Sequence, residues 1–148
     1  MIRIERSPFE PGAELAAFAE RVPGAGAIAS FTGLVRAESD GSEVSELDLE
    51  HYPALTEKVI AAIGEEARAR FGLTGLIIVH RHGTMVPGEP IVFVAAAAAH
   101  RRAAFGAVDY MMDRLKTEAP FWKRERGPDG ARWIEARPAD LKDRTRWG

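Results

Sequence analysis

Hydrophobic and polar positions follow two different periods along the chain, and the shorter period predicts strands. Alternating or short apolar runs bounded by glycine, proline or polar residues are typical of strands. They predict strands over residues 1–5, 26–36, 44–52, 75–83 and 90–99. Residues 121–126 and 131–136 flank a Gly-Pro-Asp-Gly tetrapeptide and should pair as a hairpin. Residues 37–43 are expected to form a polar loop, and residues 84–89 a turn.

The longer period predicts helices over residues 11–22, 53–72 and 100–119, and a short one over 139–147. Pro11 stands near the start of the first helix and Gly72 at the end of the second, where these residue types are common. The expected inward stripes are Leu55, Val59, Ile60, Ile63 and Ala67 on the second helix, and Ala104, Phe105, Val108, Met111, Met112 and Leu115 on the third.

The order of these elements predicts the fold class. Because the strands are not strictly interleaved with helices, we expect an α+β fold with a mixed or antiparallel sheet. Two long helices pack on this sheet, and a hairpin follows near the C-terminus. No internal repeat or linker interrupts the pattern, so a single domain should span residues 1–148.

Composition narrows the possible functions. The formal net charge of -2 gives no general reason to expect nucleic acid or an acidic membrane as partner. The absence of cysteine excludes disulfides, thiolate metal sites and a cysteine nucleophile. The longest apolar run, residues 91–99, is too short to span a bilayer, and the first ten residues lack the apolar core of a signal peptide. We therefore expect a cytoplasmic protein.

Charge is distributed unevenly, with acids concentrated over residues 37–66 and bases over residues 100–126. Two of the bases, Lys116 and Lys123, flank Pro120, which should end the third helix and reverse the chain. Such a reversal can bring the two ammonium groups together, and they would repel each other unless an anion lay between them. The alternative is that Lys116 simply complements the negative end of its helix.

The start of the same helix carries a second group of cations. His100, Arg101 and Arg102 stand where free backbone N–H groups favour an anion, and Arg36 closes an earlier strand. Arginines there suit a phosphate or a carboxylate. The alternative is that they are solvated surface charges.

Two other patterns point to different chemistry. His80 and His82 have a strand spacing that two zinc ligands could use, but no third ligand is evident nearby, so we expect no metal. Trp122 and Trp133 lie beside basic residues and could stack on nucleobases, although aromatic residues on a hairpin more often belong to a core or an interface.

Several motifs together resemble a known family. The segments SFTGLVR, LEHYPALTEK, VHRHG, AHRRAAF, MDRLKTEAPFWKRE and RWIEA occur in order between about residue 26 and residue 147. In this arrangement the chain is similar to the large, catalytic subunit of molybdopterin synthase. One departure is Leu34, which stands where the family often has a lysine, so an anion contact from that side chain is absent.

The resemblance implies a fold, a reaction and partners. The family has an α/β hammerhead fold and acts as a sulfurtransferase in molybdenum cofactor biosynthesis. It adds two sulfurs to cyclic pyranopterin monophosphate to form the molybdopterin dithiolene. The sulfur arrives on the C-terminal Gly-Gly thiocarboxylate of a small ubiquitin-like subunit, with no cofactor in the catalytic chain. The large subunit forms a homodimer within a heterotetramer, and a pocket can borrow cations, Arg36 among them, from the neighbouring protomer.

The resemblance also implies roles for particular residues. Lys116 and Lys123 are expected to be catalytic and to contact the substrate. The remaining substrate-binding residues are expected to be Arg36, His100, Arg101, Arg124 and Glu125, while Phe31 and Met112 form pocket wall or core. Two readings stay open beside this one: a non-enzymatic adaptor that binds the tail of a ubiquitin-like protein, and a single-stranded nucleic-acid binder.

Overall fold

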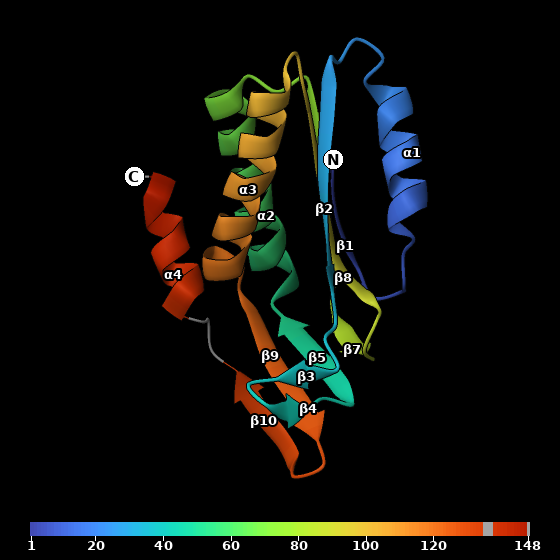
Figure 1. Ribbon diagram of the computed structural model, residues 1–148, viewed down its shortest axis with the longest axis vertical. Helices are drawn as coiled ribbons and strands as arrows, with labels where there is room; N and C mark the ends of the chain where they lie inside the picture. Colours follow the sequence, from blue (N-terminus) through green and yellow to red (C-terminus); the bar gives the residue numbers. More distant parts are fainter. Residues whose placement is uncertain (135–137, 148) are drawn as a thin grey trace.

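The larger of the two main sheets has four strands in the order β1-β6-β8-β2 (Figure 1). These strands are β1 (Ile2–Glu5), β2 (Ala27–Leu34), β6 (Gly75–Arg81) and β8 (Pro90–Ala98). The first pair, β1 and β6, is parallel and the other two pairs are antiparallel. The structure is a computed structural model that describes residues 1–134 and 138–147.

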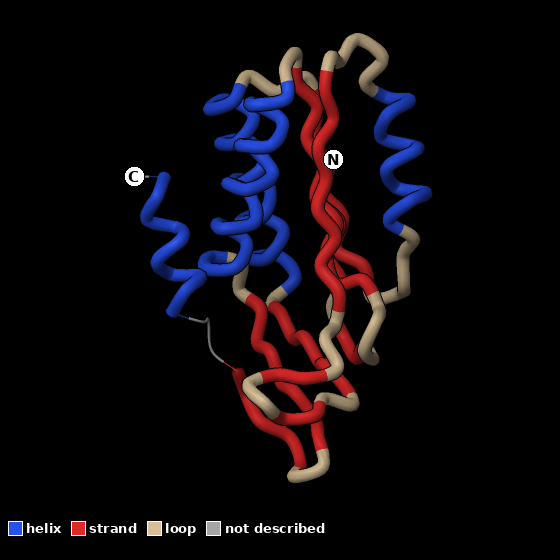
Figure 2. The backbone as a smooth tube through the Cα atoms, in the orientation of Figure 1, coloured by secondary structure: helices blue, strands red, loops and turns tan. Residues whose placement is uncertain are grey.

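Helices cover both faces of this sheet, which explains why every residue of β6 is buried (Figure 2). One face carries α1 (Pro11–Arg21), and the other carries α2 (Pro53–Phe71) and α3 (Arg101–Glu118). Leu76 and Ile78 of β6 belong to the large core with α2 and α3, whereas Ile77 and Val79 pack with Phe18 of α1. The apolar run of β6 is thus divided between two cores by the alternation of a strand.

A smaller antiparallel sheet lies at one end of the molecule, with its strands in the order β10-β9-β5-β7. Its strands are β5 (Glu46–His51), β7 (Gly83–Met85), β9 (Phe121–Gly127) and β10 (Gly130–Ile134). A two-stranded hairpin, β3 (Glu38–Ser39) with β4 (Ser42–Glu43), lies beside it. Phe121 packs against the large core and also against the core of the smaller sheet, so it joins the two parts.

The C-terminal segment packs on the outside of α3 (Figure 1). It consists of α4 (Pro138–Arg144) and a 3-10 turn (Thr145–Trp147). Trp147 donates a hydrogen bond from Nε1 to Asp113 Oδ2 at 2.6 Å, and Arg144 Nε lies 2.9 Å from Glu118 Oε2. Within residues 1–134 and 138–147, none of the helices combines the length and the apolar character needed to cross a membrane.

The α+β class, the mixed sheet with two long helices and the hairpin are confirmed. Two inward positions were wrong: Leu55 is 49% exposed and Phe105 is 66% exposed. At 100° per residue, Leu55 lies about 140° around α2 from Ile60, and Phe105 lies about 100° around α3 from Ala104. Both side chains therefore lie outside the apolar stripe of their helix.

The two segments expected to be irregular contain short strands. The region 37–43 includes the β3–β4 hairpin, and Thr84 and Met85 belong to β7, which pairs with β5. The hairpin turn is also tighter than expected, because Gly127 and Gly130 belong to the paired strands. The end of the expected strand 131–136 lies outside the described residues.

Candidate active site

The junction between α3 and β9 places two lysines in one region. Lys116 stands in the last turn of α3, and the Phe121 N–H donates to the carbonyl of Ala119 at 2.8 Å, which turns the chain around Pro120. Lys123 follows two residues later on β9. The charge of Lys116 is among the causes that lower the pKa of Lys123, so the two lysines act on each other electrostatically across the reversal.

Lys123 has an unusual environment for a lysine. Burial is the main cause that lowers its pKa, and the charges of Lys116 and Arg36 lower it further. Glu125 acts in the opposite direction, since its carboxylate favours the ammonium form. Arg36, which follows β2, therefore contributes positive charge to the surroundings of Lys123. Such an arrangement can hold an anion, and the lowered pKa makes it easier for Lys123 to release its proton.

Glu125 lies between two cations. Its side chain is 6% exposed, its Oε1 lies 3.8 Å from Lys123 Nζ, and its Oε2 lies 3.5 Å from Arg132 Nη2. Arg132 also donates to the carbonyl of Ser39 at 3.1 Å, which attaches the β3–β4 hairpin to β10. The sequence analysis missed Arg132, although pairing the strands of the hairpin around residues 127–130 places it opposite Glu125.

Arg124 does not share this region, because successive side chains of a strand point to opposite faces. Its Nη2 donates to Asp48 Oδ2 at 2.9 Å, and its guanidinium lies 5.3 Å from the centre of the Trp133 ring. With Glu46, Thr84 and Arg126, the Arg124–Asp48 pair lines a polar pocket on the other face of the smaller sheet. The structure therefore separates Arg124 from the lysines.

His100 and Arg101 also lie apart from the lysines. Both are exposed at the N-terminal end of α3, where His100 is the N-cap residue and its side chain makes no capping hydrogen bond. At 1.5 Å per residue, Arg101 and Lys116 are about 22 Å apart along the helix axis. One copy of the chain thus has two cationic regions, one at each end of α3. Of the two expected wall residues, Phe31 is 41% exposed and Met112 packs against the large core.

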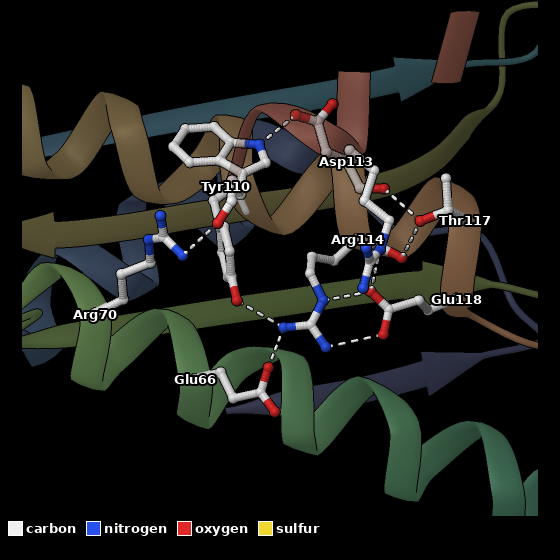
Figure 3. A network of polar contacts seen from close by, with 9 residues as sticks. Glu66, Arg70, Tyr110, Asp113, Arg114, Thr117 and Glu118 are labelled. Carbon is white, nitrogen blue, oxygen red and sulfur yellow. Dashed lines mark hydrogen bonds and ion pairs between the residues drawn. The ribbon is translucent and has the colours of Figure 1, made fainter. Parts of the chain in front are cut away.

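A network of charged and polar side chains joins the C-terminal half of α3 to α2 (Figure 3). Arg114 pairs with Glu66 of α2 and with Glu118, and its Nη1 donates to Tyr110 Oη at 2.6 Å. These partners raise the pKa of Arg114, and Arg114 in turn is the main cause of the lowered pKa of Glu118. The last turn of α3 is therefore held by charge-assisted hydrogen bonds close to Lys116.

Three histidines lie at the seam between the sheets. The His51 and His82 rings have centres 4.4 Å apart, and the His80 ring stacks on Phe121 with centres 4.1 Å apart. Burial lowers the pKa of His80 to about 4, with smaller contributions from the charges of His51 and Lys116. Within the part of the chain that the structure describes, no three His, Cys, Asp or Glu side chains gather as metal ligands.

Comparisons with known proteins point to one family. A family model described as MoaE protein matches residues 4–118. The molybdopterin synthase catalytic subunit of Cereibacter sphaeroides is 51% identical over 146 residues, which cover 99% of this chain and 99% of that protein. Among solved structures, the molybdopterin biosynthesis MoaE protein from Burkholderia ambifaria has a TM-score of 0.85 and 46% identity, covering 100% of this chain and 97% of that one. The molybdopterin synthase from Staphylococcus aureus has a TM-score of 0.80 and 31% identity, covering 89% and 95%.

Proposed function

Because the chain belongs to the MoaE protein family, we propose that it is the catalytic subunit of a molybdopterin synthase. In this proposal it is a sulfurtransferase that acts on cyclic pyranopterin monophosphate. The sulfur comes from the C-terminal thiocarboxylate of a small ubiquitin-like subunit, and the product carries a dithiolene. Both reactants are anionic, so the protein must supply positive charge where they meet.

The proposal is supported by the α3–β9 junction, where Lys116 stands in the last turn of α3 and Lys123 Nζ lies 3.8 Å from the buried carboxylate of Glu125. The charges of Lys116 and Arg36 also lower the pKa of Lys123. We assign proton transfer to Lys123, because its lowered pKa brings the neutral amine closer to the working pH. Lys116 stabilises negative charge that develops at the terminal carbonyl of the carrier. Glu125 orients Lys123, and its carboxylate favours the ammonium form of the lysine.

His100 and Arg101 bind the phosphate of the precursor in this proposal, but they do so in a pocket completed by a second copy. Their distance of about 22 Å from Lys116 along α3 is too long for one small substrate to bridge within a single chain. A homodimer that places the N-terminal end of one α3 beside the α3–β9 junction of the other would unite the two cationic regions. With a small subunit bound to each copy, the assembly is a heterotetramer. We also place this assembly in the cytoplasm, which cell fractionation can test.

Reconstitution tests the function directly. The purified chain, a thiocarboxylated small subunit and the pterin precursor are combined without added metal or nucleotide, and dithiolene formation is measured. Product that depends on all three components supports the proposal. An adaptor would bind the carrier tail without forming product, and its binding would survive loss of both Lys116 and Lys123.

A complementation experiment tests the shared pocket. The Lys116→Ala and Arg101→Ala chains are each expected to be inactive, and they are then co-expressed. If each pocket takes Lys116 from one copy and Arg101 from the other, a mixed dimer has one intact pocket. Random mixing then restores about a quarter of the wild-type activity. If both residues of a pocket come from the same chain, every pocket in the mixture carries a substitution and no activity returns.

A further inference from the structure

His80 lies at the seam between the two sheets, and its ring contacts Phe121, one of the residues between Lys116 and Lys123 in the sequence. Its side chain is on the same face of β6 as Leu76 and Ile78, which belong to the large core. The residue is 9% exposed, and its ring stacks on Phe121 with an angle of 14° between the ring planes. This near-parallel stack covers one side of the Phe121 ring.

A hydrogen bond fixes the orientation of the His80 ring. Nδ1 lies 2.8 Å from the carbonyl oxygen of Arg81. Because a carbonyl only accepts, Nδ1 carries the proton and donates it, and Nε2 is unprotonated in the neutral ring. Rotating the ring would break this buried bond, so His80 gives Phe121 a flat surface of fixed direction.

Phe121 in turn connects the two lysines. It stands five residues after Lys116 and two residues before Lys123, and it opens β9. In the β5–β9 ladder it pairs with His51, whose ring centre lies 5.6 Å away. Since its side chain also packs against both cores, the position of Phe121 determines where the end of α3 and the start of β9 lie.

The position of His80, against Phe121 and within the influence of the Lys116 charge, favours an uncharged ring. Burial lowers the pKa of the imidazole to about 4, so the ring is uncharged at neutral pH. A cation here would repel Lys116, whose charge already acts on His80. An aromatic ring without charge can therefore support Phe121 and leave the cationic region undisturbed.

We propose that His80 is a positioning residue for sulfur transfer, whose stack on Phe121 sets the separation of Lys116 and Lys123. The inference rests on the proposed function of these two lysines. His80 acts through Phe121 and touches neither reactant. A misplacement of about 1 Å at a reacting group can cost about a hundredfold in rate, so a support of this kind has a measurable effect.

The test compares His80→Ala, which removes the stack, with His80→Phe, which keeps a flat ring. His80→Ala should lower turnover at saturating reactants by about 10- to 100-fold. Carrier affinity should stay within about threefold, because the loss lies in positioning and not in binding. His80→Phe should retain turnover within about threefold. Should the alanine variant fail to fold, His80→Leu fills the space without a flat ring and takes its place.

A second measurement follows the lysine itself. Trace acetylation at a series of pH values, read by mass spectrometry, gives the midpoint at which Lys123 becomes reactive. In His80→Ala this midpoint should rise toward that of an ordinary lysine, because a displaced Phe121 admits water beside Lys123. His80→Phe should keep the lowered midpoint. The acetylation midpoint can be measured without turnover. It therefore still tests the positioning role of His80 if the reconstituted protein forms no dithiolene and the proposed function fails.

Two matched variants complete the design. His82→Ala removes an imidazole from the same seam that contacts His51 and does not stack on Phe121. Ile78→Val removes one methylene from the same face of β6. Both should leave the Lys123 midpoint unchanged. The inference is overturned if His80→Phe loses as much turnover as His80→Ala, if His80→Ala keeps the wild-type rate and midpoint, or if Ile78→Val reproduces both effects.

Discussion

Lys123 Nζ lies 3.8 Å from Glu125 Oε1, and the carboxylate is the more buried partner of the two. Glu125 is the stronger of two anions, with Asp140, that oppose three effects on the pKa of Lys123: burial, the charge of Lys116 and the charge of Arg36. The balance leaves the pKa of Lys123 below its ordinary value. A lysine in this environment gives up its proton more readily than an exposed lysine does.

Replacing Glu125 with Gln should lower the pKa of Lys123 further. The carboxylate of Glu125 raises the pKa of Lys123, and a neutral amide of the same shape does not. The pH-dependent acetylation of Lys123 should shift its midpoint to lower pH. Glu46→Gln is the matched control, since Glu46 pairs with Arg126 on the other face of the same sheet. A midpoint that stays fixed or moves upward in Glu125→Gln contradicts the assignment.

Substitutions of the two lysines should separate charge from proton transfer. Lys116→Ala and Lys123→Ala should each lower dithiolene formation by about 10²- to 10⁴-fold with unchanged thermal unfolding. Lys116→Arg should retain a measurable part of the rate, because arginine keeps the charge. Lys123→Arg should be as inactive as Lys123→Ala, since a guanidinium does not give up its proton.

Lys58→Ala, which removes an exposed lysine of α2, is the control for this series. Near-normal turnover of Lys116→Ala would remove the basis for the assigned site. Equal rates for Lys116→Arg and Lys123→Arg would argue against distinct roles.

Local patterns in the sequence were sufficient for most elements of the fold. Pro120 alone indicated the chain reversal between Lys116 and Lys123, because a proline limits both its own backbone conformation and that of the residue before it. The short strand β7 was not predictable in the same way. Thr84 and Met85 follow a histidine-rich strand and look like the start of a turn, but they pair with β5, which is more than thirty residues earlier. Non-local pairing of this kind leaves no local signal.

The prediction of the candidate site from the sequence was limited in a similar way. Charge grouped Arg101 and Arg124 with the lysines, whereas helix rise places Arg101 at the far end of α3 and strand alternation turns Arg124 to the opposite face. Both outcomes follow from simple geometry once the elements are assigned. The role of Ser39 in holding Arg132 depends on how the β3–β4 hairpin packs, which the sequence pattern does not specify.

Acid should destabilise the protein partly through His80. The unfolded imidazole has a pKa of about 6.5, and burial lowers the folded value to about 4. The unfolded state therefore binds more protons in this range, so this contribution to stability is complete above pH 6.5 and is lost as the pH falls toward 4. The total contribution is about 3 kcal/mol.

Urea unfolding at a series of pH values between 7 and 4 measures this effect. His80→Phe cannot be protonated, so its free energy of unfolding should fall less steeply with acid than that of the wild type. Other acid-sensitive groups remain in both proteins and cancel in the difference. Identical slopes for the two proteins would show that His80 is not the source.

Asp113 should anchor the C-terminal segment. It accepts hydrogen bonds from Trp147 Nε1 at 2.6 Å and from Arg146 Nη2 at 2.5 Å, and its side chain is 12% exposed. Asp113→Ala should cost about 1 to 3 kcal/mol and increase hydrogen exchange in α4 and the following turn. Asp109→Ala is the control, because Asp109 is largely exposed and holds only Arg146 among the described contacts. Equal exchange in the two variants would contradict an anchoring role for Asp113.

Gly127 should tolerate no side chain, because β9 passes close to the β3–β4 hairpin there. A Cβ atom at Gly127 would lie 2.3 Å from the backbone carbonyl oxygen of Glu43, and a backbone atom cannot move aside as a flexible side chain can. Gly127→Ala should therefore lower the free energy of unfolding by about 1 to 3 kcal/mol. A Cβ atom at Gly12 of α1 would meet nothing within 4 Å beyond its chain neighbours and its own helix, so Gly12→Ala should be neutral or stabilising by up to about 1 kcal/mol. Urea unfolding gives the free energy of unfolding of both variants. Equal values would mean that the hairpin moves away from Gly127 at no cost. A displaced hairpin would also draw Ser39 from Arg132, so Gly127→Ala should shift the acetylation midpoint of Lys123 as well.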